Sequence, residues 1–478
     1  MIALDHLSAA RVGVLGLGRT GLSCCLALQL GGARVVAWDD SEDARQRASA
    51  AGIAIAELAR PDIRQRIDRL IVSPGIPHLY PNPHPALVAA QRSGTLLDND
   101  IGIFFEWLAH QAAASRNGVV PRTVAITGTN GKSTTAALTA HILSAADVDA
   151  RLAGNIGRPV LELEGMTSCT CVVLEVSSYQ SDLAAHLAPD VAVFLNLAPD
   201  HLSRHGGVGG YFAAKKRLFD GPSLAAAMVG VDEGEGEFLA AHLRSFNTNC
   251  KVFEMSACGR RTIVDGAVFS AGKVDVFSQG KLQARFRFAA NPALRGLHNG
   301  QNAAAAAIAC RYFGLPNNAV AEGLMSFPGL PHRMQLVGRA NGITVVNDSK
   351  ATNFVSAERA LEANSSILWI AGGQAKETGI GGISRFSDRV RKAYLIGSCA
   401  EDFAIQLDRI PHSLCRCMET AVAMAIEDAC PGDTILLSPA AASFDQYRDF
   451  EHRGDHFVEL TRRLLLRHAK AEPNARAS

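Results

Sequence analysis

A run of glycine, lysine and hydroxyl residues near position 130 has the composition of a phosphate-binding loop. Its order is Gly128-x-x-Gly131-Lys132-Ser133, between an apolar β-branched run and an alanine-rich helical run. Glycines let backbone N–H groups close around an anion, and the start of a helix adds a partial positive charge. Lys132 can reach the outer phosphates, and Ser133 offers a hydroxyl to Mg²⁺. Ile126 stands where the strict pattern has its first glycine, but the strand and helix on either side still predict nucleotide binding.

Acidic and histidine side chains follow the next two apolar runs. Glu175 comes directly after the run 171–174, and Asp200-His201 follows the run 191–196. The carboxyl ends of parallel strands share one edge of a sheet, so these side chains are expected near the phosphate loop, with Glu175 as a Mg²⁺ ligand. Each could be only a strand-ending turn residue. Two such strands converging on one loop favour a site.

A second glycine loop opens the chain. Gly16-x-Gly18-x-x-Gly21 lies between a buried strand and an apolar helix, and Asp39 ends the next strand 18 residues later. This is the dinucleotide-binding arrangement, in which the acid binds a ribose, so NAD is the simplest ligand. The turn Ser73-Pro74-Gly75 ends a third strand, where open α/β sheets bind ligands. A dehydrogenase would explain this region but not the loop at 128–134.

Strands and helices alternate along most of the chain, which predicts an α/β fold of three domains. The expected ranges are 1–114 for an N-terminal Rossmann-like domain, 115–329 for a central P-loop-type ATPase sheet, and 330–478 for a C-terminal Rossmann-like domain. Residues 222–290 alternate weakly and contain many glycines, which predicts short antiparallel strands with one helix. A helix is expected over 303–309, with amide side chains at its first turn.

Composition excludes several classes of protein. The 478 residues are 48% hydrophobic and carry 47 basic and 46 acidic side chains, which gives no reason to expect nucleic acid. No secretory signal and no run of 18 apolar residues is present, so we expect no membrane segment and a cytoplasmic location. Eleven cysteines are too sparse for a disulfide scaffold. The pairs Cys169-x-Cys171 and Cys415-x-Cys417 lack zinc spacing and are expected in the core.

Eight segments in one order resemble the Mur ligase family over nearly the whole chain. They are Gly128 to Thr134, Leu174 to Ser178, Asp200-His201, Tyr211-x-x-Ala-Lys215, His298-Asn299-x-x-Asn302, His332-Arg333, Asn347 to Asn353, and Leu437-Ser438-Pro439 with Ser443 to Phe450. The last two point to the member that adds D-glutamate. The resemblance implies an ATP-dependent amide ligase of peptidoglycan precursor synthesis, with UDP-N-acetylmuramoyl-L-alanine and D-glutamate as substrates and a monomeric state.

The resemblance also implies roles for particular residues. The N-terminal domain would hold the UDP end of the sugar nucleotide, despite its dinucleotide pattern. The positions carried over for UDP are Thr20, Asp39, Ser73 and Gly75; for ATP they are Gly128, Thr129, Asn130, Gly131, Lys132, Ser133, Thr134, Asn302, Arg333, Asp348 and Lys350. Asn155 and His201 would face the muramoyl substrate. Two Mg²⁺ ions are expected, with Ser133, Glu175, His201 and Lys215 as ligands.

Lys215 matches the lysine that carries a carbamate in this family, although its neighbour Lys216 could be confused with it. Taken alone, both lysines would form a solvated helix face. The glutamate pocket is matched by Thr352, Lys376, Ser443 and Phe450. The segment Ala371 to Lys376 departs from the family's usual G-G-D-G-K.

The implied mechanism follows from carboxylate chemistry. A carboxylate is a poor electrophile, and transfer of the ATP γ-phosphate to it gives an acyl phosphate that an amine can attack. Lys132 and Arg333, with the metal ions, would neutralise charge on the transferred group. Water would hydrolyse the acyl phosphate, so the C-terminal domain is expected to close over the site. Three alternatives stay open: a dehydrogenase, a non-catalytic nucleotide-binding module, and a related ligase that adds L-glutamate or extends folate.

Overall fold

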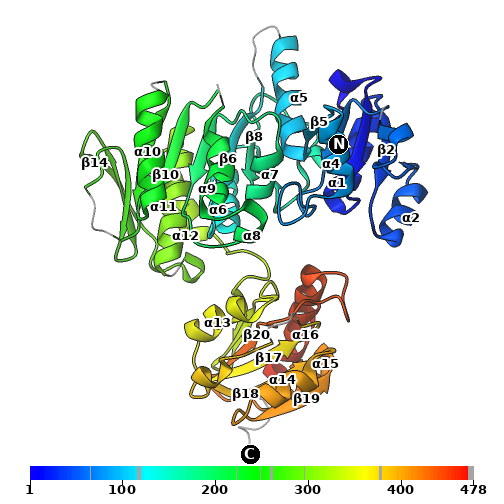
Figure 1. The fold of residues 1–478 in the computed structure, drawn as a ribbon. Helices are drawn as coiled ribbons and strands as arrows, with labels where there is room; N and C mark the ends of the chain where they lie inside the picture. The colour runs from blue at the N-terminus through cyan, green and yellow to red at the C-terminus, as the bar shows by residue number, and fades with distance from the viewer. Residues whose placement is uncertain are drawn as a thin grey trace, which may run out of the picture. The chain divides into compact units, whose positions relative to one another are not determined.

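The computed structural model describes residues 1–64, 66–115, 120–221, 223–247, 249–258, 262–294, 296–375 and 379–471. The chain divides into two units, Met1–Phe327 and Pro328–Ser478 (Figure 1). Within the described ranges, the strands form three sheets, two in the first unit and one in the second. All three combine parallel strands with crossover helices, and the predicted three-domain α/β fold class is therefore confirmed.

The first sheet is parallel throughout and has the order β3-β2-β1-β4-β5. Its strands are β1 Arg11–Leu15, β2 Arg34–Trp38, β3 Ala54–Ile55, β4 Arg69–Val72 and β5 Leu96–Asp98. The helices of this region are α1 Arg19–Leu30, α2 Glu42–Ala50, α3 Pro61–Arg64, α4 Pro85–Arg92 and α5 Asp100–Ala114. Strand order reverses at β1, between β2 and β4, and this switch point is where open sheets bind ligands. The predicted strand-to-helix setting of Gly16 to Gly21 is present there.

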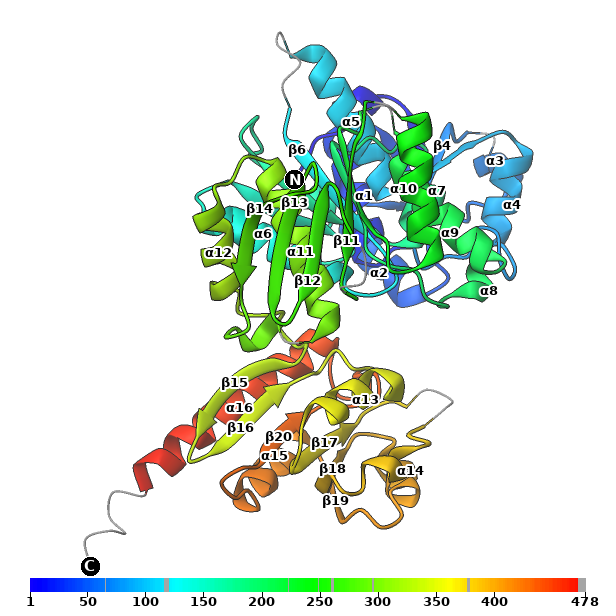
Figure 2. The same cartoon turned by 90° about the vertical axis from the view of Figure 1, so that its left-hand side faces the viewer.

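The central sheet has the order β14-β13-β12-β11-β10-β9-β6-β8-β7. Its strands are β6 Arg122–Thr127, β7 Ala150–Gly154, β8 Cys171–Glu175, β9 Val191–Phe194, β10 Ala226–Gly230, β11 Lys251–Ser256, β12 Gly266–Ser270, β13 Lys273–Ser278 and β14 Lys281–Arg287. Its helices are α6 Lys132–Ala145, α7 Ser178–Leu183, α8 Leu202–His205, α9 Val208–Lys216, α10 Gly234–Phe246, α11 Leu297–Tyr312 and α12 Asn317–Ser326. Figure 2 shows β12, β13 and β14 side by side at one end of this sheet.

Burial explains why the middle of the central sheet is so apolar. Every residue of β8 and β9 is buried, because helices cover both faces, and strands buried on both sides are continuous apolar runs. Toward β14 the burial alternates, as expected for a strand with one solvated face. The antiparallel prediction for 222–290 is correct for β12 to β14 only, since β10, β11 and β12 pair in parallel.

The second unit contains one sheet of order β15-β16-β20-β17-β18-β19. Its strands are β15 Gln335–Ala340, β16 Ile343–Asn347, β17 Ile367–Gly372, β18 Val390–Ile396, β19 His412–Arg416 and β20 Thr434–Leu437, and only β15 pairs antiparallel. Its helices are α13 Phe354–Ala363, α14 Ala400–Gln406, α15 Met418–Glu427 and α16 Phe450–Ala471. Separate apolar clusters cover the two faces of this sheet.

Two local predictions need correction. The helix expected over 303–309 begins earlier, at Leu297, so Asn302 lies in its second turn rather than before it. Cys169 is exposed and Cys417 is half-buried, whereas Cys171 and Cys415 lie in the core as expected. Cys258 and Cys430 are also exposed. Among the described residues, no helix is long and apolar enough to cross a membrane.

Candidate active site

The predicted phosphate loop joins β6 to α6 at the centre of its sheet. Gly131 precedes the helix with φ 84°, a left-handed conformation that favours glycine. A Cβ atom there would also lie 2.2 Å from Asn302 Oδ1. Lys132 Nζ donates to the carbonyl oxygens of Gly128 at 2.9 Å and Thr129 at 2.8 Å. The lysine ammonium therefore lies next to the loop backbone, where its positive charge would attract a bound anion.

Two amide side chains stabilise the loop and the helix that follows it. Asn302 Oδ1 accepts from Thr135 Oγ1 at 3.1 Å, which ties α11 to α6. Asn196 Oδ1 accepts from the backbone N–H of Asn130 at 2.9 Å, and Asn196 Nδ2 donates to Gln301 Oε1 at 2.8 Å. The sequence predicted Asn302 through the family resemblance, but it did not single out Asn196 or Gln301. Ser133 and Thr134 are buried in the first turn of α6.

Strand register brings Glu175 to the loop, as predicted. Ile126 of β6 pairs with Glu175 of β8, both at the carboxyl ends of their strands. Glu175 is 2% exposed; its Oε1 accepts from Asn155 Nδ2 at 2.8 Å, and its Oε2 is buried without a hydrogen-bond partner. A buried acceptor without a partner is unfavourable unless a ligand supplies one. Asn155 and Glu175 are thus together, and one carboxylate oxygen is available for a cation.

Lys215 lies on α9 and is 1% exposed. Its Nζ donates to the carbonyl oxygen of Gly128 at 2.8 Å, the same oxygen that accepts from Lys132. The pKa of Lys215 lies well below its usual value, because burial and then the charge of Lys132 disfavour the ammonium form. Lys216 instead pairs with Asp220 at 2.7 Å on the surface. The two adjacent lysines therefore have different environments.

His201 is exposed, whereas Glu175 and Lys215 are buried. It has φ 51°, its Nε2 lies 3.5 Å from Asp200 Oδ2, and its ring centroid lies 5.3 Å from that of Tyr179. Burial lowers the pKa of His201, while the charge of Asp200 acts in the opposite direction. A neutral imidazole can accept a hydrogen bond or bind a cation.

The N-terminal loop is held on two sides by the residues predicted to bind UDP. Ser73 Oγ donates to the Gly16 carbonyl at 2.9 Å, while Asp39 Oδ2 accepts from Leu17 N at 2.6 Å and Asp39 Oδ1 from Ser41 N at 2.8 Å. A Cβ at Gly21 would lie 1.7 Å from the Gly16 carbonyl oxygen. Thr20 is half-buried in the first turn of α1. The Asp39 carboxylate thus shapes the loop, in addition to any contact with a ribose.

A group of side chains that the sequence did not reveal joins this loop region to α7 and α8. Arg204 Nη1 donates to the Gly75 carbonyl at 3.2 Å, and its guanidinium lies 4.5 Å from the Tyr179 ring centroid. His78 Nε2 lies 2.9 Å from Asp182 Oδ2. No spacing in the sequence relates residues 75 and 78 to residues 182 and 204, so only the fold brings them together. The predicted Ser73 to Gly75 turn and the His201 segment are consequently neighbours.

The second unit holds its predicted residues at the carboxyl ends of β16 and β20. Asp348 is buried; it accepts from Ser438 Oγ at 2.8 Å and from Met334 N at 3.1 Å. Burial raises the pKa of Asp348 to about 6. The backbone N–H of Lys350 donates to His332 O at 2.9 Å, and its ammonium lies 5.4 Å from the Phe450 ring centroid. Arg333 is exposed.

The predicted glutamate-pocket residues lie on three segments of the same unit. Thr352 is half-buried in the segment after β16, Ser443 is buried after β20, and Phe450 begins α16. Ser349 Oγ donates to the Phe450 carbonyl at 2.8 Å, so the first and third segments are in contact. Lys376 lies outside the described residues.

The donor set suits magnesium better than a transition metal. Throughout the described ranges, no group of three or more His, Cys, Asp and Glu side chains could hold a metal ion. Mg²⁺ is typically bound by one or two carboxylates together with hydroxyl, water and phosphate oxygens. The unpartnered oxygen of Glu175 and the hydroxyl of Ser133 fit that pattern.

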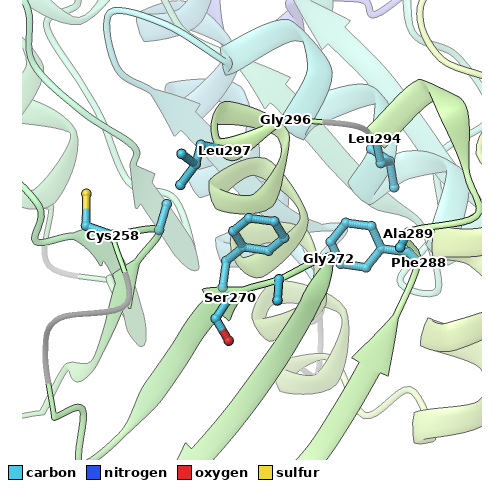
Figure 3. Close-up of a pocket in the computed structure, with 11 residues that line it drawn as sticks. Cys258, Ser270, Gly272, Phe288, Ala289, Leu294, Gly296 and Leu297 are labelled. Carbon is cyan, nitrogen blue, oxygen red and sulfur yellow. The ribbon is translucent and has the colours of Figure 1, made fainter.

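An apolar pocket of about 520 Å³ lies beside the start of α11 (Figure 3). Phe269, Phe288, Leu294 and Leu297 line it, together with Cys258 and small residues of the β12 to β13 turn. Because α11 also carries Asn302 to the phosphate loop, one helix connects the pocket with the anion site.

Comparisons with known proteins agree with the class that the fold and the phosphate loop define, a nucleotide-dependent enzyme with α/β domains. A model of the Mur ligase middle domain matches residues 126–310, and a model of the Mur ligase glutamate ligase domain matches residues 332–441. The first covers the central sheet from the phosphate loop to α11, and the second covers most of the second unit.

Several relatives match over nearly their whole length. UDP-N-acetylmuramoylalanine–D-glutamate ligase of Cereibacter sphaeroides is 49% identical over 466 residues, covering 97% of this chain and 100% of the relative. The protein of the same name from Dinoroseobacter shibae is 49% identical over 467 residues, again covering 97% and 100%. UDP-N-acetylmuramate-alanine ligase of Thermotoga maritima shares the fold, with a TM-score of 0.57 at 16% identity over 95% of this chain and 99% of that one.

The chain belongs to the Mur ligase family. It is an ATP-dependent amide ligase of peptidoglycan synthesis. The N-terminal glycine loop is thus part of a ligase rather than a dehydrogenase.

Proposed function

We propose that the enzyme joins D-glutamate to UDP-N-acetylmuramoyl-L-alanine, with ATP cleaved to ADP and phosphate. The observation that carries this proposal is the 49% identity, over 97% of the chain, to relatives named for that reaction. The local geometry agrees with it, because the phosphate loop, Glu175 and Asn155 converge at one edge of the central sheet.

The reaction needs an activated carboxylate. ATP phosphorylates the alanyl carboxylate, the resulting acyl phosphate is attacked by the amine of glutamate, and phosphate leaves with the bond pair as the amide forms. Lys132 donates hydrogen bonds to the loop carbonyls, and we assign it to the transferred phosphate. Gly128 to Thr134 surround the phosphates through backbone N–H groups. His201 and Asn155 are assigned to the muramoyl substrate.

Magnesium binding is proposed at Glu175 and Ser133, with His201 and Lys215 completing two ion sites. Bound Mg²⁺ would neutralise charge on the phosphates during transfer. The unpartnered Oε2 of Glu175 supports one of these sites.

Carbamylation of Lys215 is part of the proposal. A neutral amine attacks CO₂, forms a nitrogen–carbon bond and releases one proton, giving a carbamate with a single negative charge. The lowered pKa of Lys215 favours the neutral amine that this step requires. The product replaces a cation beside Lys132 with an anion, which removes like-charge repulsion and supplies a metal ligand.

We assign three domains to the substrates, with limits at 1–114, 115–329 and 330–478. The first would hold UDP through Thr20, Asp39, Ser73 and Gly75, and the second would hold the ATP phosphates. The third would contribute Arg333, Asp348 and Lys350 to the nucleotide, and Thr352, Lys376, Ser443 and Phe450 to glutamate. The apolar pocket beside α11 has room for the adenine ring. The cytoplasmic location and the monomeric state stay predictions.

The test is release of ADP by the purified full-length enzyme in the presence of Mg²⁺. We expect release only when D-glutamate and UDP-N-acetylmuramoyl-L-alanine are both present. Release that requires L-glutamate, or a folate in place of the sugar nucleotide, would show that a related ligase activity is the correct one.

A further inference from the structure

The second unit contains a buried arginine, Arg453. Arg453 lies in the first turns of α16, is 1% exposed, and is among the largest fully buried side chains of the described residues. Burying a guanidinium is unfavourable unless its donors are bonded and its charge is compensated. Neither the reaction mechanism nor any sequence pattern discussed above accounts for this residue.

The guanidinium bonds to three segments that are far apart in the sequence. Arg453 Nε donates to Ser349 Oγ at 3.1 Å, and Nη2 donates to Ser349 O at 2.9 Å. Arg453 Nη1 donates to Ala441 O at 3.1 Å, Ala442 O at 3.2 Å and Gly372 O at 3.5 Å. These acceptors follow β16, follow β20 and end β17, respectively. A planar group with five donors is suited to this task, whereas a lysine is not.

Two of the three segments continue into residues assigned to the glutamate pocket. Thr352 follows Ser349 by three positions, and Ser443 follows Ala442 directly. Ser349 Oγ donates a hydrogen bond to the Phe450 carbonyl at 2.8 Å, which connects the start of α16 to the same group. A Cβ at Gly373 would lie 3.1 Å from Arg453 Nη1, so the end of β17 is close as well.

Among the residues that the structure describes, no carboxylate is bonded to the guanidinium of Arg453. All five of the hydrogen bonds that the structure describes for this side chain end on neutral oxygens. Burial lowers the pKa of Arg453 to about 10, and Asp445 is the acidic side chain whose charge opposes this. The side chain stays a cation at neutral pH, and its field extends to the carboxyl ends of β17 and β20.

We propose that Arg453 is a positioning residue for the acidic amino-acid substrate: it fixes the three strand-end segments and places a positive charge behind the pocket that receives a dicarboxylate. This inference rests on the proposed function. A dicarboxylic amino acid brings two negative charges into a partly buried site, and a fixed cation without a bonded carboxylate favours its entry.

The test compares Arg453→Met, Arg453→Lys and a control in the full-length enzyme. Thr461→Val serves as the control, because Thr461 is buried on the same helix, and the hydrogen bonds that the structure describes for its hydroxyl go to Phe457 O and Val458 O of that helix. We expect Arg453→Met to raise KM for D-glutamate at least tenfold, with KM for the sugar nucleotide within twofold. Arg453→Lys, which keeps the charge but not the planar group with five donors, should raise KM for D-glutamate by less. Thr461→Val should leave both KM values within twofold.

Hydrogen exchange provides a second measurement that does not depend on the substrate. Backbone amides of 347–353 and 439–446 should exchange faster in Arg453→Met but not in Thr461→Val. An unchanged glutamate KM, with kcat lowered only as far as the folded fraction, would overturn the proposal, as would unchanged exchange in both segments. If the wild-type enzyme does not use D-glutamate, the proposed function fails, and the exchange pattern alone decides whether Arg453 holds the segments.

Discussion

Lys215 and Lys132 share one carbonyl acceptor, the Gly128 oxygen. Two ammonium groups at one oxygen repel each other, and this repulsion together with burial explains why the amine of Lys215 is easily deprotonated. The adjacent Lys216 has an exposed aspartate partner instead. The sequence alone does not decide which of the two lysines carries a carbamate. Their environments favour Lys215.

Lys215→Ala should be almost inactive, because the metal site loses the carboxylate that a carbamate would supply. Added acetate or formate should partly restore turnover, since a short carboxylate can enter the vacated space and bind Mg²⁺. Steady-state ADP release with increasing acetate measures this rescue. Lys216→Ala is the matched control and should stay active without acetate. An active Lys215→Ala enzyme, or rescue confined to Lys216→Ala, would contradict the assignment.

Asp348 should make the stability of the second unit depend on pH. Its folded pKa of about 6 lies above the usual value of 3.8, so the folded state binds the proton more tightly, and stability falls as pH rises from about 4 to about 6. A shift of about two units corresponds to about 3 kcal/mol. Asp348→Asn removes this titration, so its unfolding free energy relative to the parent should increase by about 2.4 kcal/mol between pH 4 and pH 7.5.

Trp369 can report this change, because its indole donates to Ser438 O at 2.8 Å and Ser438 Oγ donates to Asp348. Urea unfolding followed by fluorescence, with Trp38 and Trp107 replaced by phenylalanine, isolates the signal. The exposed Asp388 supplies the control, and the pH-dependent difference should be larger for Asp348→Asn than for Asp388→Asn. A difference for Asp348→Asn that does not vary with pH would show that its pKa is not raised.

At the scale of elements, two glycines of the N-terminal loop differ in the space around them. In the N-terminal loop a Cβ at Gly21 would collide with the Gly16 carbonyl, whereas a Cβ at Gly18 would meet nothing within 4 Å. Gly21→Ala should therefore lower Tm and weaken UDP-substrate affinity at least tenfold. Gly18→Ala should leave Tm unchanged, so any loss of affinity in that variant reports contact with the ligand. Calorimetric titration and thermal unfolding of both variants would detect a reversed order, which would contradict the packing argument.

The sequence was sufficient to predict an element when the residues that carry its chemistry also determine its local backbone structure. The phosphate loop was located to the residue, because Gly131 needs a left-handed backbone and the flanking runs have strand and helix periodicity. Glu175 was placed by the rule that parallel strands end at one edge. The start of α11 was set too late, because His298 to Gln301 are polar or glycine and resemble a loop.

Residues that act through tertiary contacts could not be predicted in this way. Arg453 lies in an amphipathic helix with other basic residues, and nothing in the spacing distinguishes it from an exposed arginine. Arg204 contacts Gly75, and His78 contacts Asp182, only because the first and central sheets pack within one unit. Asn196 and Gln301 are 105 positions apart, and their bond follows from the packing of α11 near β9.

At the scale of the molecule, the two phosphate-type loops are assigned to different ligands. Lys132→Ala should abolish ADP formation while the UDP-substrate still binds, because the lysine belongs to the central loop and the sugar nucleotide to the N-terminal one. Isothermal titration and an ADP assay on the same preparation test this. Lost UDP-substrate affinity with intact ADP formation would show that the two assignments must be exchanged.

The same division predicts that nicotinamide nucleotides do not bind. Asp39 accepts from Leu17 N and Ser41 N, so Asp39→Ala should loosen the loop and weaken the UDP-substrate, and neither the parent nor the variant should bind NADH. Fluorescence titration with NADH at micromolar concentration is the measurement. Saturable binding would restore the dinucleotide interpretation of the N-terminal loop.

The exposed cysteines allow the motion of the two units to be measured with attached dyes. Cys169 in the first unit and Cys430 in the second are exposed, whereas most of the other cysteines are buried. Replacing the exposed Cys258 and the half-buried Cys417 with serine leaves one accessible thiol in each unit. Dyes attached to these two thiols would report the separation of the units by energy transfer throughout turnover, with no cysteine added to the chain.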